Sequence, residues 1–287
     1  MKILVFGKTG QVATQLQRFK NVQAVDRDQV DLTDPERVME MIMKSDVDAV
    51  INAAAYTAVD QAESEEAQAM AINCDASKVM AQAAAKKGIP FVQISTDYVF
   101  NGKGSRPWLP TDIPAPLGAY GKSKLAGEIA IREAGGTHAI LRTSWVFSAT
   151  GNNFVKTMLR LGQERDELSI VADQIGGPTS AAALANACYK VSMGLVNHPE
   201  KSGVYHFSGA PNISWAGFAR EIFAQANLAV QVNEIPTSEF PTPAPRPKNS
   251  RLNCRSIKEI FDISQPDWRI DLTKVLADLP PGQTCQN

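Results

Sequence analysis

Short apolar runs alternate with longer segments of helical composition along the first half of the chain. The runs fall at residues 3–6, 22–25, 49–52, 91–94 and 139–141, and each is short enough for a buried strand. The segments between them end near residues 19, 44, 87 and 134 and have the composition of helices. This repeated alternation predicts an α/β fold with a Rossmann-type, doubly wound parallel sheet.

Beyond residue 150 the alternation loosens. Strands are predicted at 168–171 and 204–207, and two short helices near 258–263 and 271–279. We expect a dinucleotide-binding domain over 1–150, with about 168–207 returning to its sheet. A smaller C-terminal α+β substrate-binding domain would comprise about 151–167 and 208–287. Residues 236–247 contain five prolines, which suits either the rigid rim of a pocket or a structured linker.

Composition narrows the class of protein. The 287 residues carry a formal net charge of −1, which gives no electrostatic case for binding nucleic acid or an anionic membrane. No uncharged apolar stretch reaches the roughly 18 residues of a transmembrane helix. The N-terminal apolar run is too short for a signal peptide, and the four cysteines are scattered, as in a reducing compartment. We therefore expect a cytoplasmic protein.

The first strand leads directly into a glycine-containing loop. Gly7 and Gly10 would allow a tight turn that brings backbone N–H groups close to a ligand. The N-terminus of the helix that follows offers unpaired donors that suit a pyrophosphate. A Gly-x-x-Gly pair alone also occurs in plain turns, but its place between a strand and a helix favours dinucleotide binding.

The second strand ends in two charged residues, near twenty residues after the loop. Asp26 could accept from the ribose 2′-OH of NAD, whereas Arg27 could pair with the 2′-phosphate of NADP. Lys8 in the loop adds a second cation that could reach that phosphate. Because both residue types are present, the sequence is compatible with either cofactor, and a solvated loop charge remains an alternative role for Arg27.

A hydroxyl and a phenol–amine pair are candidates for chemistry. Thr96 lies at the predicted carboxyl end of the fourth strand, where ligands bind in open α/β sheets. Tyr120 and Lys124 are four residues apart at the start of a predicted helix and therefore share one face. A nearby ammonium would lower the pKa of the phenol from about 10 toward the range that a general acid needs. An ordinary surface pair is the alternative.

Taken in order, these strings resemble the extended short-chain dehydrogenase/reductase family, in particular its reductases of nucleotide-linked 4-keto-6-deoxyhexoses. Matching stretches lie at 7–12, 52–60, 95–100, 120–128, 142–146, 152–154, 241–247 and 249–252, so the likeness covers nearly the whole chain. Ala13 replaces the third glycine of the family's loop, which would alter only the fit between helix and strand.

The resemblance implies NADPH-dependent reduction of a sugar 4-keto group, a step in making cell-surface polysaccharide, and is compatible with NADH as a second cofactor. Tyr120 would donate the proton, Lys124 would hold the nicotinamide ribose, and Thr96 would orient the carbonyl. Asp97, Tyr98 and Trp145 would contact sugar or thymine, and Asn153 and Arg246 the diphosphate. The implied cofactor-binding set is Gly7, Thr9, Gly10, Gln11, Val12, Asp26, Arg27, Asp31, Leu32, Ala53, Ala54, Ala55, Tyr120 and Lys124.

Other readings of the same residues stay open. The fold also suits a nucleotide-sugar epimerase or dehydratase, which returns its hydride and consumes no NADPH. It further suits a non-catalytic regulatory subunit like the one that accompanies methionine adenosyltransferase. Asn153 could be only a helix cap, and Arg246 only part of a surface ion pair. Some relatives are homodimers with Mg²⁺ held by carboxylates near the C-terminus, where Asp278 would be the candidate ligand in a non-catalytic role.

Overall fold

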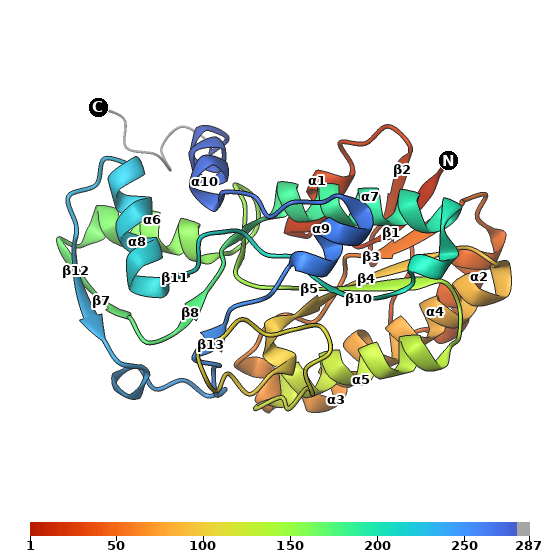
Figure 1. The fold of residues 1–287 in the computed structure, drawn as a ribbon, viewed down its shortest axis with the longest axis horizontal. Helices are drawn as coiled ribbons and strands as arrows, with labels where there is room; N and C mark the ends of the chain where they lie inside the picture. The colour runs from red at the N-terminus through yellow and green to blue at the C-terminus, as the bar shows by residue number, and fades with distance from the viewer. Residues whose placement is uncertain (280–287) are drawn as a thin grey trace.

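The computed structural model describes residues 1–279 and contains a six-stranded parallel sheet (Figure 1). The strand order is β10-β5-β4-β3-β1-β2. The strands are β1 (Ile3–Phe6), β2 (Val22–Val25), β3 (Ala49–Asn52), β4 (Phe91–Thr96), β5 (His138–Thr143) and β10 (Gly203–His206). The five strands predicted in the first half are all present, and the doubly wound sheet is confirmed.

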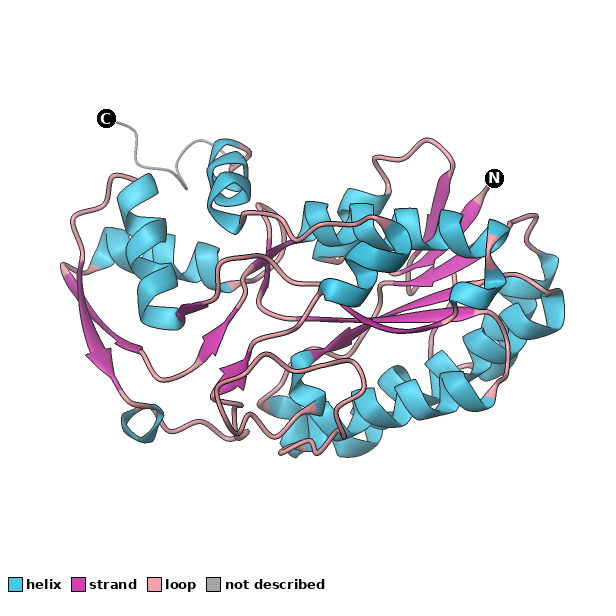
Figure 2. Cartoon of the chain, viewed as in Figure 1, coloured by secondary structure: helices cyan, strands magenta, loops and turns pink. Residues whose placement is uncertain are grey.

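Helices cover both faces of this sheet (Figures 1 and 2). One face carries α1 (Gln11–Leu16), α7 (Ala181–Asn197) and α9 (Arg255–Phe261), and the other carries α2 (Pro35–Lys44), α4 (Ala76–Lys87) and α5 (Ala119–Glu133). Asp34 caps α2 by accepting from the Arg37 N–H, with Pro35 in the first turn. The sheet is therefore buried on both sides, which explains why its strands are apolar throughout.

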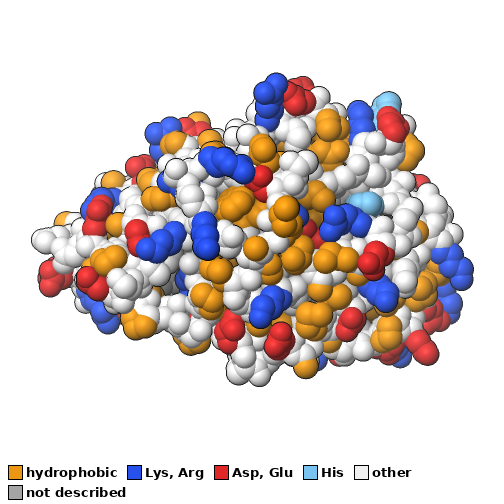
Figure 3. Space-filling model, turned by 60° about the horizontal axis from the view of Figure 1, so that its bottom comes forward, with side chains coloured by type: hydrophobic (Ala, Val, Ile, Leu, Met, Phe, Trp, Pro, Cys, Tyr) orange, Lys and Arg blue, Asp and Glu red, His pale blue; other side chains and the backbone are white. Residues whose placement is uncertain are grey.

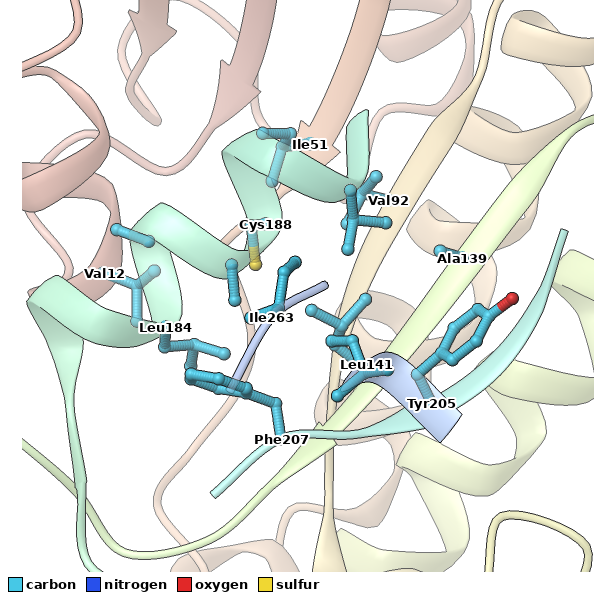
Figure 4. Packing of buried hydrophobic residues seen from close by; sticks show 14 of the residues in the cluster. Val12, Ile51, Val92, Ala139, Leu141, Leu184, Cys188, Tyr205, Phe207 and Ile263 are labelled. Atoms are coloured by element: carbon cyan, nitrogen blue, oxygen red, sulfur yellow. The ribbon is translucent and has the colours of Figure 1, made fainter. Parts of the chain in front are cut away.

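The larger core cluster lies between the sheet and the α1, α7 and α9 layer (Figure 4). Val92 and Leu141 project from β4 and β5 toward Leu184 and Cys188 on α7, and all four are fully buried. Helix α7 begins thirty residues after the predicted N-terminal domain ends at 150. Its side chains nevertheless complete the core of the N-terminal sheet. Helix α7 thus belongs with the N-terminal sheet.

A second, smaller unit is built mainly from elements that follow β5. Its helices are α6 (Phe154–Glu164), α8 (Trp215–Gln225) and α10 (Trp268–Ala277). Three small sheets accompany them, pairing β7 (Glu167–Val171) with β12 (Gln231–Ile235), β6 (Val146–Phe147) with β9 (Thr179–Ser180), and β8 (Ile175–Gly176) with β11 (Ile213–Ser214) and β13 (Asn249–Ser250). Short 3₁₀ turns lie at Gln61–Glu63, Asp97–Val99, Pro199–Lys201 and Thr237–Glu239.

The strand predicted at 168–171 forms but does not return to the main sheet. It is β7, and it pairs in parallel with β12 in the smaller unit. Leu168 and Ile170 belong to that unit's core with Phe218 and Trp268. The expected return over about 168–207 is therefore wrong for its first part, because the apolar face of β7 packs on α8; only α7 and β10 rejoin the sheet.

The helix predicted over 63–87 is interrupted. It comprises α3 (Glu66–Met70), a π-helical turn (Ala71–Asp75) and α4. Asn73 in the π turn exchanges hydrogen bonds with the backbone of Tyr56 and donates to Ser123 Oγ on α5. The adjoining α5 presents Gly127, where an added Cβ would lie 2.2 Å from the Asn73 carbonyl oxygen. The close approach of two helices therefore explains a bulge that composition did not reveal.

The surface carries mixed charge. Lys and Arg are interspersed with Asp and Glu on the face that Figure 3 shows, in keeping with the net charge of −1. None of the helices within residues 1–279 combines the length and hydropathy that crossing a bilayer requires. A phosphate-bearing ligand would accordingly depend on local groups.

Candidate active site

The loop after β1 comes very close to the chain that follows β3. Gly7 has φ 94°, and an added Cβ would lie 3.1 Å from the Ala54 backbone nitrogen. A side chain at residue 7 would be strained by its backbone conformation and crowded by its neighbour. Gly10 stands in the N-cap position of α1 with no side-chain cap. The loop therefore presents bare backbone at the carboxyl edge of the sheet.

A surface pocket opens beside this loop. It is lined by Gly7, Lys8, Thr9, Asp26, Arg27, Asp31, Leu32, Ala54 and Ala55, together with Phe6, Val25, Val30, Gln68 and Ile72. The structure thus brings together most of the cofactor residues that the sequence suggested. Gln68 and Ile72 were not predicted, because they reach the pocket from α3 and the π turn, and no sequence signal marked that bulge. Gln11 lies beyond the pocket and accepts from Ser148 and Asn153.

Two ion pairs line the pocket. Lys8 Nζ lies 3.0 Å from Asp26 Oδ2, and its hydrogen bond holds the pKa of that carboxyl below its ordinary value. Arg27 Nη2 lies 3.5 Å from Asp31 Oδ2; the Arg27 side chain is largely exposed, and that of Asp31 is partly exposed. The two cations that the sequence suggested for a 2′-phosphate are therefore present on one rim, each loosely held by a carboxylate.

Thr96 and Tyr120 meet at the carboxyl end of β4. Thr96 is the last residue of that strand and Tyr120 the second of α5. The Tyr98 and Tyr120 rings pack edge to face, with centroids 5.6 Å apart. Gly121 permits this approach, since an added Cβ there would lie 2.3 Å from the Tyr98 carbonyl oxygen. The predicted hydroxyl and phenol thus belong to one site.

The expected effect of Lys124 on the phenol is absent in this structure. Burial raises the pKa of Tyr120 to about 12, opposed by a hydrogen bond with Thr96 and reinforced by the charge of Asp97. Lys124 has only 4% of its surface exposed and donates from Nζ to the Ile94 carbonyl oxygen at 2.7 Å. Burial lowers the pKa of Lys124 to about 8. Tyr120 and Lys124 share a helix face, but this alone does not lower the pKa of the phenol. The ammonium instead donates its hydrogen bond to the Ile94 carbonyl oxygen of β4.

A buried ion pair behind the site was not predicted. Arg142 on β5 forms a bidentate pair with Glu128 on α5, with Nη2 2.6 Å from Oε2 and Nε 2.9 Å from Oε1. Ser95 Oγ donates to the same carboxylate, and both charged side chains are almost fully buried. One signal in the sequence was available: Glu128 lies four residues after Lys124 and therefore on the same face of that helix. The pair connects α5 to β5, and the Ser95 hydrogen bond connects it to β4, the strand that ends at Thr96.

The predicted substrate residues border the same end of the sheet. Asp97 is buried and follows Thr96, and Tyr98 follows in the same 3₁₀ turn. Trp145 has a left-handed backbone, φ 51°, and its ring stacks on Trp215 with centroids 3.6 Å apart. Trp215 was not anticipated, because it comes from α8, seventy positions further along the chain.

Asn153 and Arg246 have local partners in this structure. Asn153 caps α6 by accepting from the Lys156 N–H and donates to Gln11 in the loop-following helix. Arg246, from the proline-rich segment, forms a bidentate pair with Asp60 at 2.9 and 2.7 Å. The proline-rich segment thus borders the 52–60 stretch, and the helix-cap role of Asn153 is real.

Asp278 does not sit in a metal cluster. It ends α10 and lies 3.7 Å from Arg18 Nη2. Among residues 1–279 no group of three or more His, Cys, Asp or Glu side chains is placed to hold an ion. Residues 280–287, the last part of the predicted substrate-binding domain, lie outside the described residues.

Comparisons with known proteins support the resemblance. Residues 1–280 match the family described as RmlD substrate binding domain. The dTDP-4-dehydrorhamnose reductase of Shigella flexneri is 44% identical over 97% of this chain and 98% of its own. That of Burkholderia thailandensis is 46% identical, covering 97% and 99%. The crystal structure of the Bacillus anthracis dTDP-4-dehydrorhamnose reductase in complex with NADP superposes with a TM-score of 0.90 at 38% identity, covering 97% of this chain and 100% of that one.

These matches run over nearly the whole of each chain, so they concern the complete arrangement of sheet, loop and smaller unit. They confirm the resemblance to extended short-chain dehydrogenase/reductases that the motifs indicated. The chain belongs to the RmlD substrate-binding-domain family, the family of the dTDP-4-dehydrorhamnose reductases.

Proposed function

We propose that the protein reduces the 4-keto group of dTDP-4-dehydro-6-deoxy-L-mannose (dTDP-4-dehydrorhamnose) with NADPH, giving dTDP-L-rhamnose. The observation that carries the proposal is the meeting of Thr96 and Tyr120 at the edge of the sheet that also bears the Gly7 loop. Full-length relatives are named for this activity, and one of them was solved with NADP. We also propose that the protein is located in the cytoplasm. A homodimer is a separate proposal, which the assay of activity does not address.

The residues around the first loop fit a dinucleotide. Gly7 leaves a cradle that a Cβ would fill against Ala54, so backbone donors can approach a pyrophosphate. Lys8 and Arg27 offer cations for a 2′-phosphate, whereas Asp26 could accept from a free 2′-OH. We therefore favour NADPH and expect NADH to be used less well. When bound, the cofactor supplies the hydride that reduces the ketone carbon.

The chain's own residues supply orientation and a proton. The Thr96 hydroxyl would hydrogen-bond the ketone oxygen and hold it next to the Tyr120 phenol. Tyr120 would protonate that oxygen as the alcohol forms. Lys124 would hold the nicotinamide ribose, and an ammonium released from the Ile94 carbonyl toward the phenol would lower the raised pKa of Tyr120.

Residues around this pair would bind the rest of the substrate. Asp97, Tyr98 and Trp145 would contact sugar or thymine. Arg246 would pair with the diphosphate, for which its bidentate guanidinium is suited, by exchanging its present partner Asp60. Asn153 would contribute its amide next to the loop-facing Gln11.

The test is to mix the protein with NADPH and freshly prepared dTDP-4-keto-6-deoxy-L-sugar. Loss of reduced-nicotinamide absorbance is followed, and NMR gives the configuration at C4 of the product. Stoichiometric NADPH consumption with formation of the L-rhamno product is expected.

Each alternative gives a different result in the same assay. An epimerase or dehydratase would transform the sugar without net loss of NADPH. A regulatory subunit would reduce no ketone and would co-purify with a methionine adenosyltransferase. Intact Thr96, Tyr120 and Lys124 favour the reductase over that subunit.

A further inference from the structure

The helix that carries Tyr120 begins without a cap of its own. Gly118 is the N-cap residue of α5 and has no side chain that could accept from the first N–H groups. The first turn of the helix, residues 119–122, contains no acidic residue. Glu63, from the 3₁₀ turn at Gln61–Glu63, supplies an acceptor, because its Oε1 accepts from the Ala119 N–H at 2.8 Å. A carboxylate also suits the positive end of the helix.

Gly118 leaves the space that this carboxylate occupies. An added Cβ at residue 118 would lie 2.3 Å from Glu63 Oε1 and 3.4 Å from Pro245 Cδ. The backbone of Gly118, with φ −125° and ψ 176°, is extended and is one that any residue adopts. The close approach of Glu63, and not backbone conformation, therefore accounts for a glycine at this position.

The turn that carries Glu63 is itself fixed in the fold. Ala62 is fully buried and forms a small apolar cluster with Ala119, against which the Tyr120 ring packs. The Ala62 N–H donates to the Ala58 carbonyl oxygen at 2.9 Å. A carboxylate that projects from a fixed turn can hold its partner in one position.

The hydrogen bond to Glu63 lies next to the proton donor in the chain, since Ala119 directly precedes Tyr120. Glu63 is exposed, so water could satisfy the Ala119 N–H if the carboxylate were lost. Water would not hold the first turn in one place, however, and a displacement of about 1 Å can cost about 100-fold in rate. The bond therefore matters more for where the phenol lies than for whether the helix forms.

We propose that Glu63 is a positioning residue for ketone reduction, which holds the Ala119 N–H, fixes the first turn of α5 and thereby sets the Tyr120 phenol against the ketone oxygen. The role rests on the proposed function and adds a residue to its machinery. Glu63 acts through the backbone next to Tyr120 and transfers no proton itself.

Glu63→Met and Glu63→Gln test the role as a matched pair. Both keep nearly the length of the side chain, but only glutamine keeps an oxygen that can accept from the Ala119 N–H. Glu63→Met should lower the single-turnover rate about tenfold, while the KM for the dTDP-sugar and the Kd for NADPH stay within about twofold of wild type. Glu63→Gln should restore the rate to within about threefold of wild type.

Gly118→Ala breaks the same bond from the other side. The added methyl meets the end of a flexible side chain, so the Glu63 carboxylate moves and the fold is kept. This variant should lose rate as Glu63→Met does, and the double variant should lose no more than either single one. It also tests the role if Glu63→Met fails to fold. The control is Asp34→Ala, which removes a carboxylate cap from α2 and should lower the urea midpoint without changing the rate.

A second measurement needs no substrate. In protein labelled with ¹³Cζ-tyrosine, the Tyr120 resonance, identified by its loss in Tyr120→Phe, reports the surroundings of the phenol. It should shift in Glu63→Met and Gly118→Ala and keep its wild-type position in Glu63→Gln and Asp34→Ala. Hydrogen exchange of the Ala119 amide should quicken about tenfold in the same two variants that shift the resonance.

Two results would overturn the positioning role. The first is a wild-type rate and an unmoved Tyr120 resonance in both Glu63→Met and Gly118→Ala. The second is an equal loss of rate in Glu63→Gln and Glu63→Met, because the negative charge and not the hydrogen bond would then control the rate. A wild-type protein that reduces no ketone would instead overturn the proposed function, and the resonance would still decide whether Glu63 places the phenol.

Discussion

Lys124 Nζ donates to the backbone carbonyl of Ile94 at 2.7 Å, so the ammonium rests against strand β4. The phenol of Tyr120, one helical turn earlier, keeps a pKa raised to about 12 by burial. In this arrangement the two groups therefore do not act as an acid and its activating cation. A bound nicotinamide ribose would offer the ammonium another acceptor in place of the Ile94 carbonyl oxygen. The ammonium would then lie closer to the phenol and lower the pKa of Tyr120.

Replacing Lys124 by methionine should change how stability depends on pH. The folded protein holds this lysine with a pKa of about 8, whereas its ordinary value is 10.5. Between those pH values the unfolded chain binds more protons, so wild-type stability gains as pH rises. Relative to Lys124→Met, wild type should gain up to about 3 kcal/mol of unfolding free energy across that window.

Urea unfolding at pH 8 and pH 10 would measure this gain. The control is Lys122→Met, which removes an exposed lysine from the same helix and should not alter the pH slope. Parallel stability curves for wild type and Lys124→Met over the window would show that Lys124 remains charged in the fold.

Tyr120→Phe should abolish most turnover without unfolding the protein. It removes the proton donor, and such groups contribute about 10²- to 10⁴-fold to rate. NADPH consumption with the dTDP-sugar measures the loss, and circular dichroism checks the fold. Tyr189→Phe is the matched control, because Tyr189 stacks on Phe19 and bonds Asn21, away from the site. A Tyr120→Phe enzyme with wild-type turnover would remove the phenol from the mechanism.

Local signals predicted the N-terminal half of the fold well. The apolar run of β1 and the Gly7 loop are each encoded by adjacent residues, and both are present. The features that were missed depend on contacts between distant segments. Strand β7 pairs with β12 because both pack on α8, and the π turn fits Gly127 of another helix.

The same distinction holds in the site. Thr96 and Tyr120 could be predicted because each stands at the end of a recognisable element. The position of the Lys124 ammonium could not, since it depends on a carbonyl oxygen thirty residues earlier. Nor could the Trp145–Trp215 stack, whose partners come from different elements of the smaller unit.

Gly7→Ala should weaken cofactor binding. The residue has φ 94°, and the added methyl would lie 3.1 Å from the Ala54 nitrogen, so the loop must shift. We expect NADPH affinity, measured by fluorescence titration, to fall about tenfold or more, which is about 1.4 kcal/mol. Gly88→Ala is the control, because its φ is also positive at 72° but nothing lies within 4 Å. Equal losses of affinity in both variants would trace the effect to general strain.

Lys8→Ala and Arg27→Ala should reduce the preference for NADPH over NADH. Each removes a cation from the pocket rim, and the 2′-phosphate is the only group that distinguishes the two cofactors. The ratio of the two dissociation constants, measured at fixed salt because exposed pairs are screened, gives the effect. Lys44→Ala removes an exposed lysine outside this pocket and should leave the ratio unchanged. A ratio unaffected by both rim variants would assign cofactor choice to Asp26.

Glu128→Gln should destabilise the protein strongly. It leaves the Arg142 guanidinium buried at 2% exposure without its bidentate partner, and breaking such pairs costs about 3–5 kcal/mol. Glu164→Gln, which breaks an exposed pair with Arg160, should cost at most about 0.5 kcal/mol. Urea unfolding of both variants gives the comparison. Equal, small losses would mean that the phenyl ring of Phe100, which lies 5.0 Å from the guanidinium, compensates the charge.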